Sequence, residues 1–117
     1  MLLDAMSYEL PVVTTDIWAN SEIIEDGKTG FLIQKSKKIK YFDENFIPQW
    51  SLPQTLKIIK KNIDPQTINQ IIEVTAKLIE NSNLRRKLGY AARLEIEKGK
   101  FSIENRNKQL KEIFDKI

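Results

Sequence analysis

The 117-residue sequence contains no cysteine and no histidine, and these absences exclude several kinds of site. Without cysteine there can be no disulfide and no thiolate nucleophile. Without histidine, a Ser-His-Asp triad and a histidine-based zinc site are also excluded. No apolar run approaches the roughly 18 residues of a membrane span, and no signal peptide is visible, because Asp4 follows Leu2 and Leu3 directly. We therefore expect a cytoplasmic protein.

The overall composition is that of an ordinary soluble domain, but its charge is uneven. The length predicts one domain. Seven lysines and two acids lie between residues 35 and 61, a surplus of five positive charges, whereas the whole chain carries only +3. The basic character therefore belongs to one segment and not to the fold as a whole.

The first 34 residues alternate between helical and strand patterns. Leu2, Leu3 and Met6 have helical spacing, and a buried-strand run follows at 11–15. One helical turn at 21–24, for which Ser21 is a candidate cap, leads to the turn dipeptide Asp26-Gly27 and a second apolar run at 31–33. This order predicts an α/β fold with two parallel neighbouring strands.

The remaining chain divides into an insertion and a helical part. Residues 35–62 interleave lysines with aromatic residues and prolines, which predicts a surface loop; Ser51 or Leu52, before Pro53, begins a helix. Residues 63–117 predict three more helices, which begin after Asp64, after Asn81 or Ser82, and at Phe101-Ser102. Their periodic apolar faces are assigned to the core. We expect Ile103 to be buried, whereas Phe114 and Ile117 stay exposed for want of a partner surface.

Two features at helix starts and turns favour structural readings over phosphate binding. The run Asp26-Gly27-Lys28-Thr29-Gly30 lacks the spacing of a P-loop and is interpreted as a plain turn. Glu22 opens a helical turn after a strand, where an acid is stabilising but would repel phosphate.

A series of short motifs covers the first third of the chain closely and the last third loosely. They are Asp4-Ala5-Met6, Pro11-Val12-Val13, Thr15-Asp16, Glu22-Ile23-Ile24, residues 26–33 and, towards the end, Leu84-Arg85, Leu88-Gly89, Ala92-Arg93 and Phe101-Ser102. In this order the motifs resemble those of family-4-like retaining glycosyltransferases, which have the GT-B fold of two Rossmann-like domains. The resemblance implies a partial Rossmann-like C-terminal domain of the GT-B fold, with short parallel strands followed by a helical part.

The resemblance further implies transfer of a hexosyl group from a nucleotide-diphosphate sugar to an acceptor hydroxyl, with no metal or organic cofactor. Asp4 stands at the second position of the family's Glu-x7-Glu pair and would bind the donor ribose; the other reading is a solvated helix acid. The first Glu would fall before Met1, so we expect the isolated chain to be the donor-binding C-terminal portion and to be inactive without the N-terminal domain. The family usually has glycine at the position of Glu9 and often has glycine in the loop that contains Trp18. Strain is expected at Glu9.

The lysine cluster leaves two readings open. Lys35, Lys37, Lys38 and Lys40 are either a solvated face or a contact to membrane or acceptor. Nucleic acid is disfavoured, because no nucleic-acid-binding signature accompanies the lysines. An alternative function for the whole chain is a non-catalytic α/β–helical interaction module with a basic surface.

Overall fold

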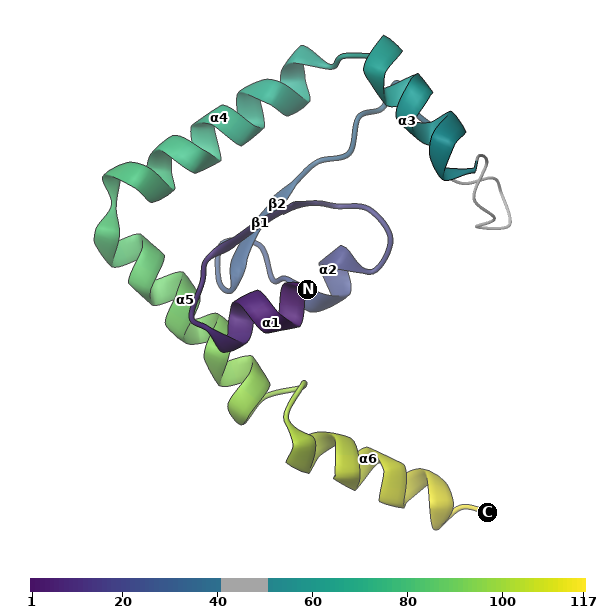
Figure 1. Cartoon of the computed structure of the whole chain (residues 1–117). Helices are drawn as coiled ribbons and strands as arrows, with labels where there is room; N and C mark the ends of the chain where they lie inside the picture. The colour runs from purple at the N-terminus through teal and green to yellow at the C-terminus, as the bar shows by residue number, and fades with distance from the viewer. Residues whose placement is uncertain (41–50) are drawn as a thin grey trace.

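The computed structural model describes residues 1–40 and 51–117, which form a mixed α/β fold (Figure 1). In chain order its elements are α1 (Leu2–Ser7), β1 (Val12–Thr15), α2 (Asn20–Ile23), β2 (Gly30–Ile33), α3 (Leu52–Lys61), α4 (Pro65–Glu80), α5 (Ser82–Glu97) and α6 (Ile103–Phe114). The residues Tyr41, Phe42, Phe46, Pro48 and Trp50 of the predicted surface loop lie outside the described residues.

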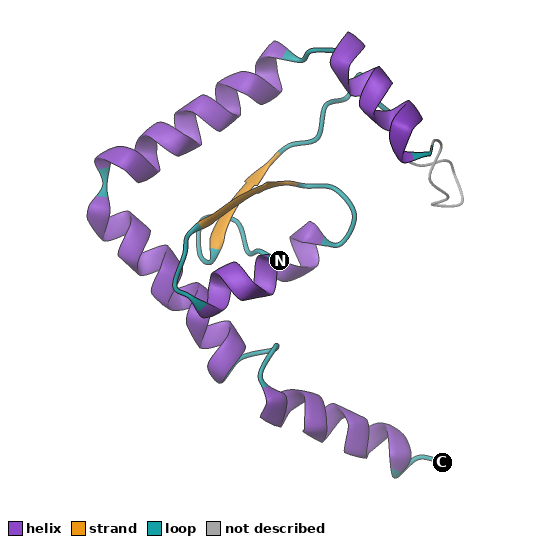
Figure 2. Ribbon diagram, in the orientation of Figure 1, coloured by secondary structure: helices purple, strands orange, loops and turns teal. Residues whose placement is uncertain are grey.

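The two strands pair in parallel, as the sequence predicts. Val12 lies opposite Gly30 and Thr15 opposite Ile33. Because the strands run in the same direction, the chain has to cross back between them, and α2 lies in that crossover. Figure 2 shows the pair enclosed by helices. The α/β prediction, a partial Rossmann-like unit, is confirmed.

The outer edge of β2 is covered by side chains instead of a further strand. The Leu32 N–H donates to the Asp26 carboxylate at 2.9 Å, and the Gln34 N–H donates to the Gln70 side-chain oxygen at 3.0 Å. These bonds satisfy backbone donors that an edge strand would otherwise expose. Gln70 belongs to α4, so the second bond also fastens this helix to the sheet.

The core is small and lies where α1 packs against α5 and β1. Met6 and Ala92 are fully buried, and Val12 and Ile24 complete the cluster. The molecule measures 49 × 43 × 19 Å, and its radius of gyration is 17.2 Å. A compact chain of this length would have a radius of gyration of about 13 Å. The helices α3 to α5 therefore lie around the sheet instead of closing over it, and α6 leads away from it (Figure 1).

Most of the predicted helix starts are confirmed by their caps. Asp64 accepts a hydrogen bond from Gln66 N–H, Asn81 from Leu84 N–H, and Ser102 from Asn105 N–H. Ser51 precedes α3, and its N–H donates to Gln54 Oε1 at 3.0 Å. The expectation for Ser21 was wrong, because α2 begins one residue earlier and Ala19 stands at its N-cap.

Both residues that replace an expected glycine have a left-handed backbone. Glu9 has φ of 58°, and Trp18 has φ of 52°. A side chain at such a φ is sterically unfavourable, which is why glycine suits these positions. The strain expected at Glu9 is therefore confirmed, and Trp18 is a second site of the same kind.

Two expectations about buried faces were wrong. On α4 the apolar face is mostly exposed, and only Leu78 is buried. On α6, Ile103 is 69% exposed, whereas it was expected to be buried. The reason is the same in both cases: no described element lies over these faces. The expected exposure of Phe114 and Ile117 is confirmed.

Candidate functional site

Asp4 lies on α1 with an accessible carboxylate. Its side chain is 79% exposed and lies 2.9 Å from the amino group of Met1. Its backbone carbonyl accepts hydrogen bonds from the Ser7 hydroxyl, at 2.7 Å, and from Tyr8 N–H, at 3.3 Å. The backbone is thus held by the helix, while the exposed carboxylate stays accessible to a ligand with two donors, such as a ribose diol.

The carboxyl ends of the two strands are fastened together by polar contacts. The Asp16 N–H donates to the Ile33 carbonyl at 2.7 Å. The Asn20 amide donates to the Thr14 hydroxyl at 3.0 Å and to the Thr15 carbonyl at 2.9 Å. The sequence analysis did not single out Asn20. Its signal in the sequence is a side-chain amide placed directly after the loop that follows the strand. In open α/β sheets, ligands bind beyond this end of the strands.

An apolar groove of about 440 Å³ lies beyond the same end of the strands, and sequence reasoning did not predict it. It is lined from β1 and the loop that follows it, from the segment after β2, and from α3 and α4. The lining residues are Thr15, Ile17, Trp18, Lys35, Ser36, Ile39, Leu56, Ile59, Asn62, Ile63, Asp64, Thr67 and Ile68. Asp4 does not line this groove, so the structure separates the two kinds of predicted site residue.

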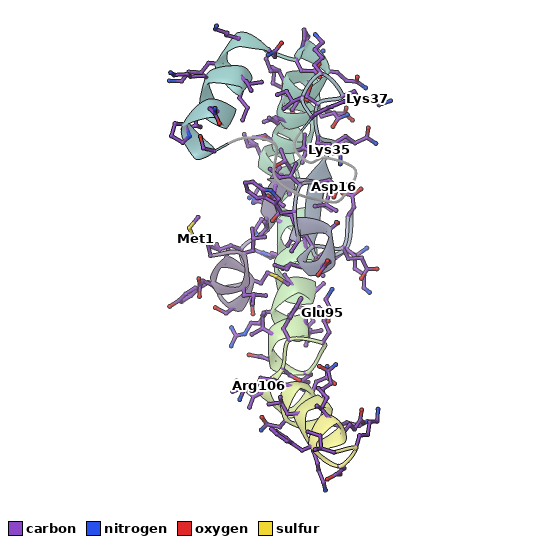
Figure 3. All side chains as sticks on the ribbon, turned by 90° about the vertical axis from the view of Figure 1, so that its right-hand side faces the viewer. Met1, Asp16, Lys35, Lys37, Glu95 and Arg106 are labelled. Atoms are coloured by element: carbon purple, nitrogen blue, oxygen red, sulfur yellow. The ribbon has the colours of Figure 1, made fainter. Side chains whose placement is uncertain are left out.

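The four lysines of the candidate contact all point into solvent. Lys35, Lys37, Lys38 and Lys40 are exposed, whereas Ser36 and Ile39 between them are buried. Lys35 also lines the groove. Figure 3 shows Lys35 and Lys37 projecting from the same part of the molecule, near Asp16 at the end of β1.

A short hydrogen bond ties this lysine segment to α4. The Ser36 hydroxyl donates to the Asp64 carboxylate at 2.5 Å. This bond holds the pKa of Asp64 below its ordinary value, with further help from the Gln66 N–H and the charge of Lys38. Asp64 therefore stays ionised in its double role as helix cap and anchor of the segment.

The turn before β2 has the structural role that its sequence indicates. Lys28 forms an ion pair with Glu25 at 2.8 Å, and the buried Thr29 hydroxyl accepts from Glu25 N–H at 2.9 Å. These contacts occupy the polar side chains within the turn itself. The backbone carbonyl of Glu22 accepts a hydrogen bond from the Lys100 ammonium group. The structural role of its carboxylate stays a prediction.

Searches for a metal site and for a membrane span found neither in the described parts of the chain. Across residues 1–40 and 51–117, no three acidic side chains are grouped so as to hold a metal ion. Within the same residues, no helix has the length and apolarity that crossing a membrane requires.

Comparison with known proteins gives one match. Residues 1–45 match the family described as glycosyl transferases group 1. No curated protein and no solved structure matches the chain. The matched region contains α1, both parallel strands and the four exposed lysines. Residues 1–45 of this chain are therefore similar to the glycosyl transferases group 1 family.

Proposed function

We propose that this chain is the donor-binding C-terminal portion of a family-4-like retaining glycosyltransferase with the GT-B fold. It would take part in hexosyl transfer from a nucleotide-diphosphate sugar to an acceptor hydroxyl. The observation that carries the proposal is the family match over residues 1–45, which coincides with the parallel strand pair and with α1. Lys35, Lys37, Lys38 and Lys40 are assigned to contact with a membrane or an acceptor.

Asp4 is the residue we assign to the donor ribose. Its carboxylate is accessible on α1, and carboxylate oxygens accept from both hydroxyls of a ribose. Aspartate is one methylene shorter than the family's glutamate, so its reach is reduced. We therefore expect weak binding, which Asp4→Glu should strengthen.

The test is ligand-observed NMR with uridine, guanosine and adenosine diphosphates, each added alone to the full chain. Asp4→Asn should weaken binding of the recognised nucleotide by about tenfold, because a charged hydrogen-bond acceptor is lost. Asp115→Asn, a matched change of an exposed acid beyond α6, should leave binding unchanged. If no nucleotide binds, or if Asp4→Asn has no effect, the interaction-module function is favoured instead.

We also propose that these 117 residues have no transfer activity by themselves. Sugar transfer in the GT-B arrangement needs a facing domain and a first carboxylate, and neither is encoded in this sequence. An assay for transfer and for donor hydrolysis should detect no turnover. Reproducible turnover that is abolished by Asp4→Ala would contradict this expectation.

A further inference from the structure

Two of the segments that line the groove at the carboxyl ends of the strands are rich in lysine; we call the groove with these lysines the basic groove. Lys35, Lys37, Lys38 and Lys40 belong to the segment whose Ser36 and Ile39 line the groove, and Lys35 itself lines it. Lys57, Lys60 and Lys61 belong to α3, whose Leu56 and Ile59 line it. All seven lysines are exposed, and none forms an ion pair with another described residue.

Large apolar side chains of the basic groove are also exposed. Trp18 is 64% and Ile63 is 67% exposed, and Leu56, Ile59 and Ile68 are exposed as well. A contiguous exposed apolar patch marks a surface that binds something. Trp18 adds to this conclusion, because it is presented to solvent from a left-handed backbone that disfavours any side chain.

Acidic side chains in the lining do little to neutralise these lysines. Among the lining residues that the structure describes, Asp64 is the one carboxylate, and it already accepts hydrogen bonds from the Ser36 hydroxyl and the Gln66 N–H. Its carboxylate is thereby directed at the protein. Among the described residues, the groove is thus lined mainly by apolar side chains, and the lysines of its two flanking segments outnumber the neighbouring acids Asp16 and Asp64.

We propose that the basic groove docks the protein on an anionic lipid membrane. The apolar side chains would enter the boundary between headgroups and acyl chains, and the lysines would contact lipid phosphates. A membrane matches both halves of the surface at once. Nucleic acid would leave the apolar residues in water, and a symmetric second copy would set lysines against lysines. The proposal does not depend on sugar transfer.

The test is flotation of the full chain with vesicles of two compositions. Vesicles made of phosphatidylserine and phosphatidylcholine in equal parts should carry the protein, whereas vesicles of phosphatidylcholine alone should not. Raising the salt concentration should weaken the binding, because it screens the lysine charges. In a Trp50→Phe background, where Trp18 is the remaining tryptophan, the fluorescence maximum should shift to shorter wavelength with the anionic vesicles.

Two pairs of variants test the lysines and the apolar residues separately. Lys35→Gln with Lys37→Gln should weaken binding about thirtyfold, since each lysine near an anionic surface contributes roughly a fivefold factor. The same change at Lys108 and Lys116, which lie on and beyond α6, should have little effect. Ile63→Gln should weaken binding roughly tenfold, whereas Ile79→Gln, an equally exposed position at the far end of α4, should not.

Four outcomes would overturn the proposal. The first is that a chain shown by circular dichroism to be folded does not bind anionic vesicles. The second is an equal loss of binding in the groove variants and their controls, and the third is equal binding to both kinds of vesicle. The fourth, lysine-dependent binding of a nucleic acid without vesicle binding, would favour a different partner.

Discussion

The backbone of Glu9 lies directly against Gly89 of α5. A Cβ atom at Gly89 would lie 1.9 Å from the Glu9 carbonyl oxygen, closer than any real contact allows. The side chain of Glu9 also reaches the same helix, where its carboxylate lies 3.3 Å from the Arg93 guanidinium group. The turn after α1 therefore packs against α5, although the two segments are about eighty residues apart in the sequence.

Gly89→Ala should destabilise the protein, although alanine favours helices more than glycine does. Helix propensity alone would predict a gain of about 1 kcal/mol. The new methyl group would meet backbone atoms that cannot move aside, so we expect a net loss of at least about 2 kcal/mol in the free energy of unfolding. Urea denaturation measures it. As a control, Lys87→Ala at an exposed position on the same helix should change the free energy of unfolding by no more than about 0.5 kcal/mol. A Gly89→Ala variant that is more stable than the parent would show that the contact is wrong.

The left-handed backbone of Glu9 can be tested by comparing two substitutions. Glu9→Gly and Glu9→Ala both remove the exposed ion pair with Arg93, so that loss cancels between them. Alanine keeps the unfavourable φ, whereas glycine relieves it. Glu9→Gly should therefore be more stable than Glu9→Ala by about 1 kcal/mol in thermal denaturation. Equal stability of the two variants would contradict the strain.

Asp64 should make stability depend on acid pH. The Ser36 hydroxyl holds its folded pKa below the ordinary value, so the carboxylate stabilises the fold above that ordinary value. The contribution should be lost as the pH falls from the ordinary pKa through the lowered one. Ser36→Ala should raise the folded pKa of Asp64, which NMR titration of the carboxyl group measures. Glu73 is the reference carboxyl: its pKa is lowered by the hydrogen bond from Lys77, outside this contact, and should be the same in both proteins.

The exposed apolar side chains of α6 should bind a hydrophobic dye. The pair Phe114→Ser and Ile117→Ser should lower dye fluorescence while leaving the helical circular dichroism signal and the melting temperature nearly unchanged, because both side chains are exposed. Leu88→Ala, at a fully buried site, should instead lower stability by about 2–5 kcal/mol. A parent chain that binds no dye and melts sharply would show that the apolar faces are covered in solution.

The local structure of this protein could be read from its sequence. Short apolar runs at 11–15 and 31–33 predict β1 and β2, and Asp64 and Ser102 mark helix starts because their side chains bond to nearby N–H groups. The motifs between residues 4 and 33 likewise indicate the family to which residues 1–45 are similar. In each case the determining interactions lie within a few residues along the chain.

Contacts between distant segments were decided by the tertiary structure. Periodicity marked the faces of α4 and α6 as apolar, but it could not tell whether another element covers them. The prediction that Ile103 is buried was therefore wrong. The groove could not be predicted from the sequence either, since Trp18, Lys35 and Ile63 come together only through the placement of α3 and α4 against the strand ends. A sequence pattern reports which surfaces are apolar or charged. Which residues each surface contacts depends on the packing of segments far apart in the chain, as the contact between Glu9 and Gly89 illustrates.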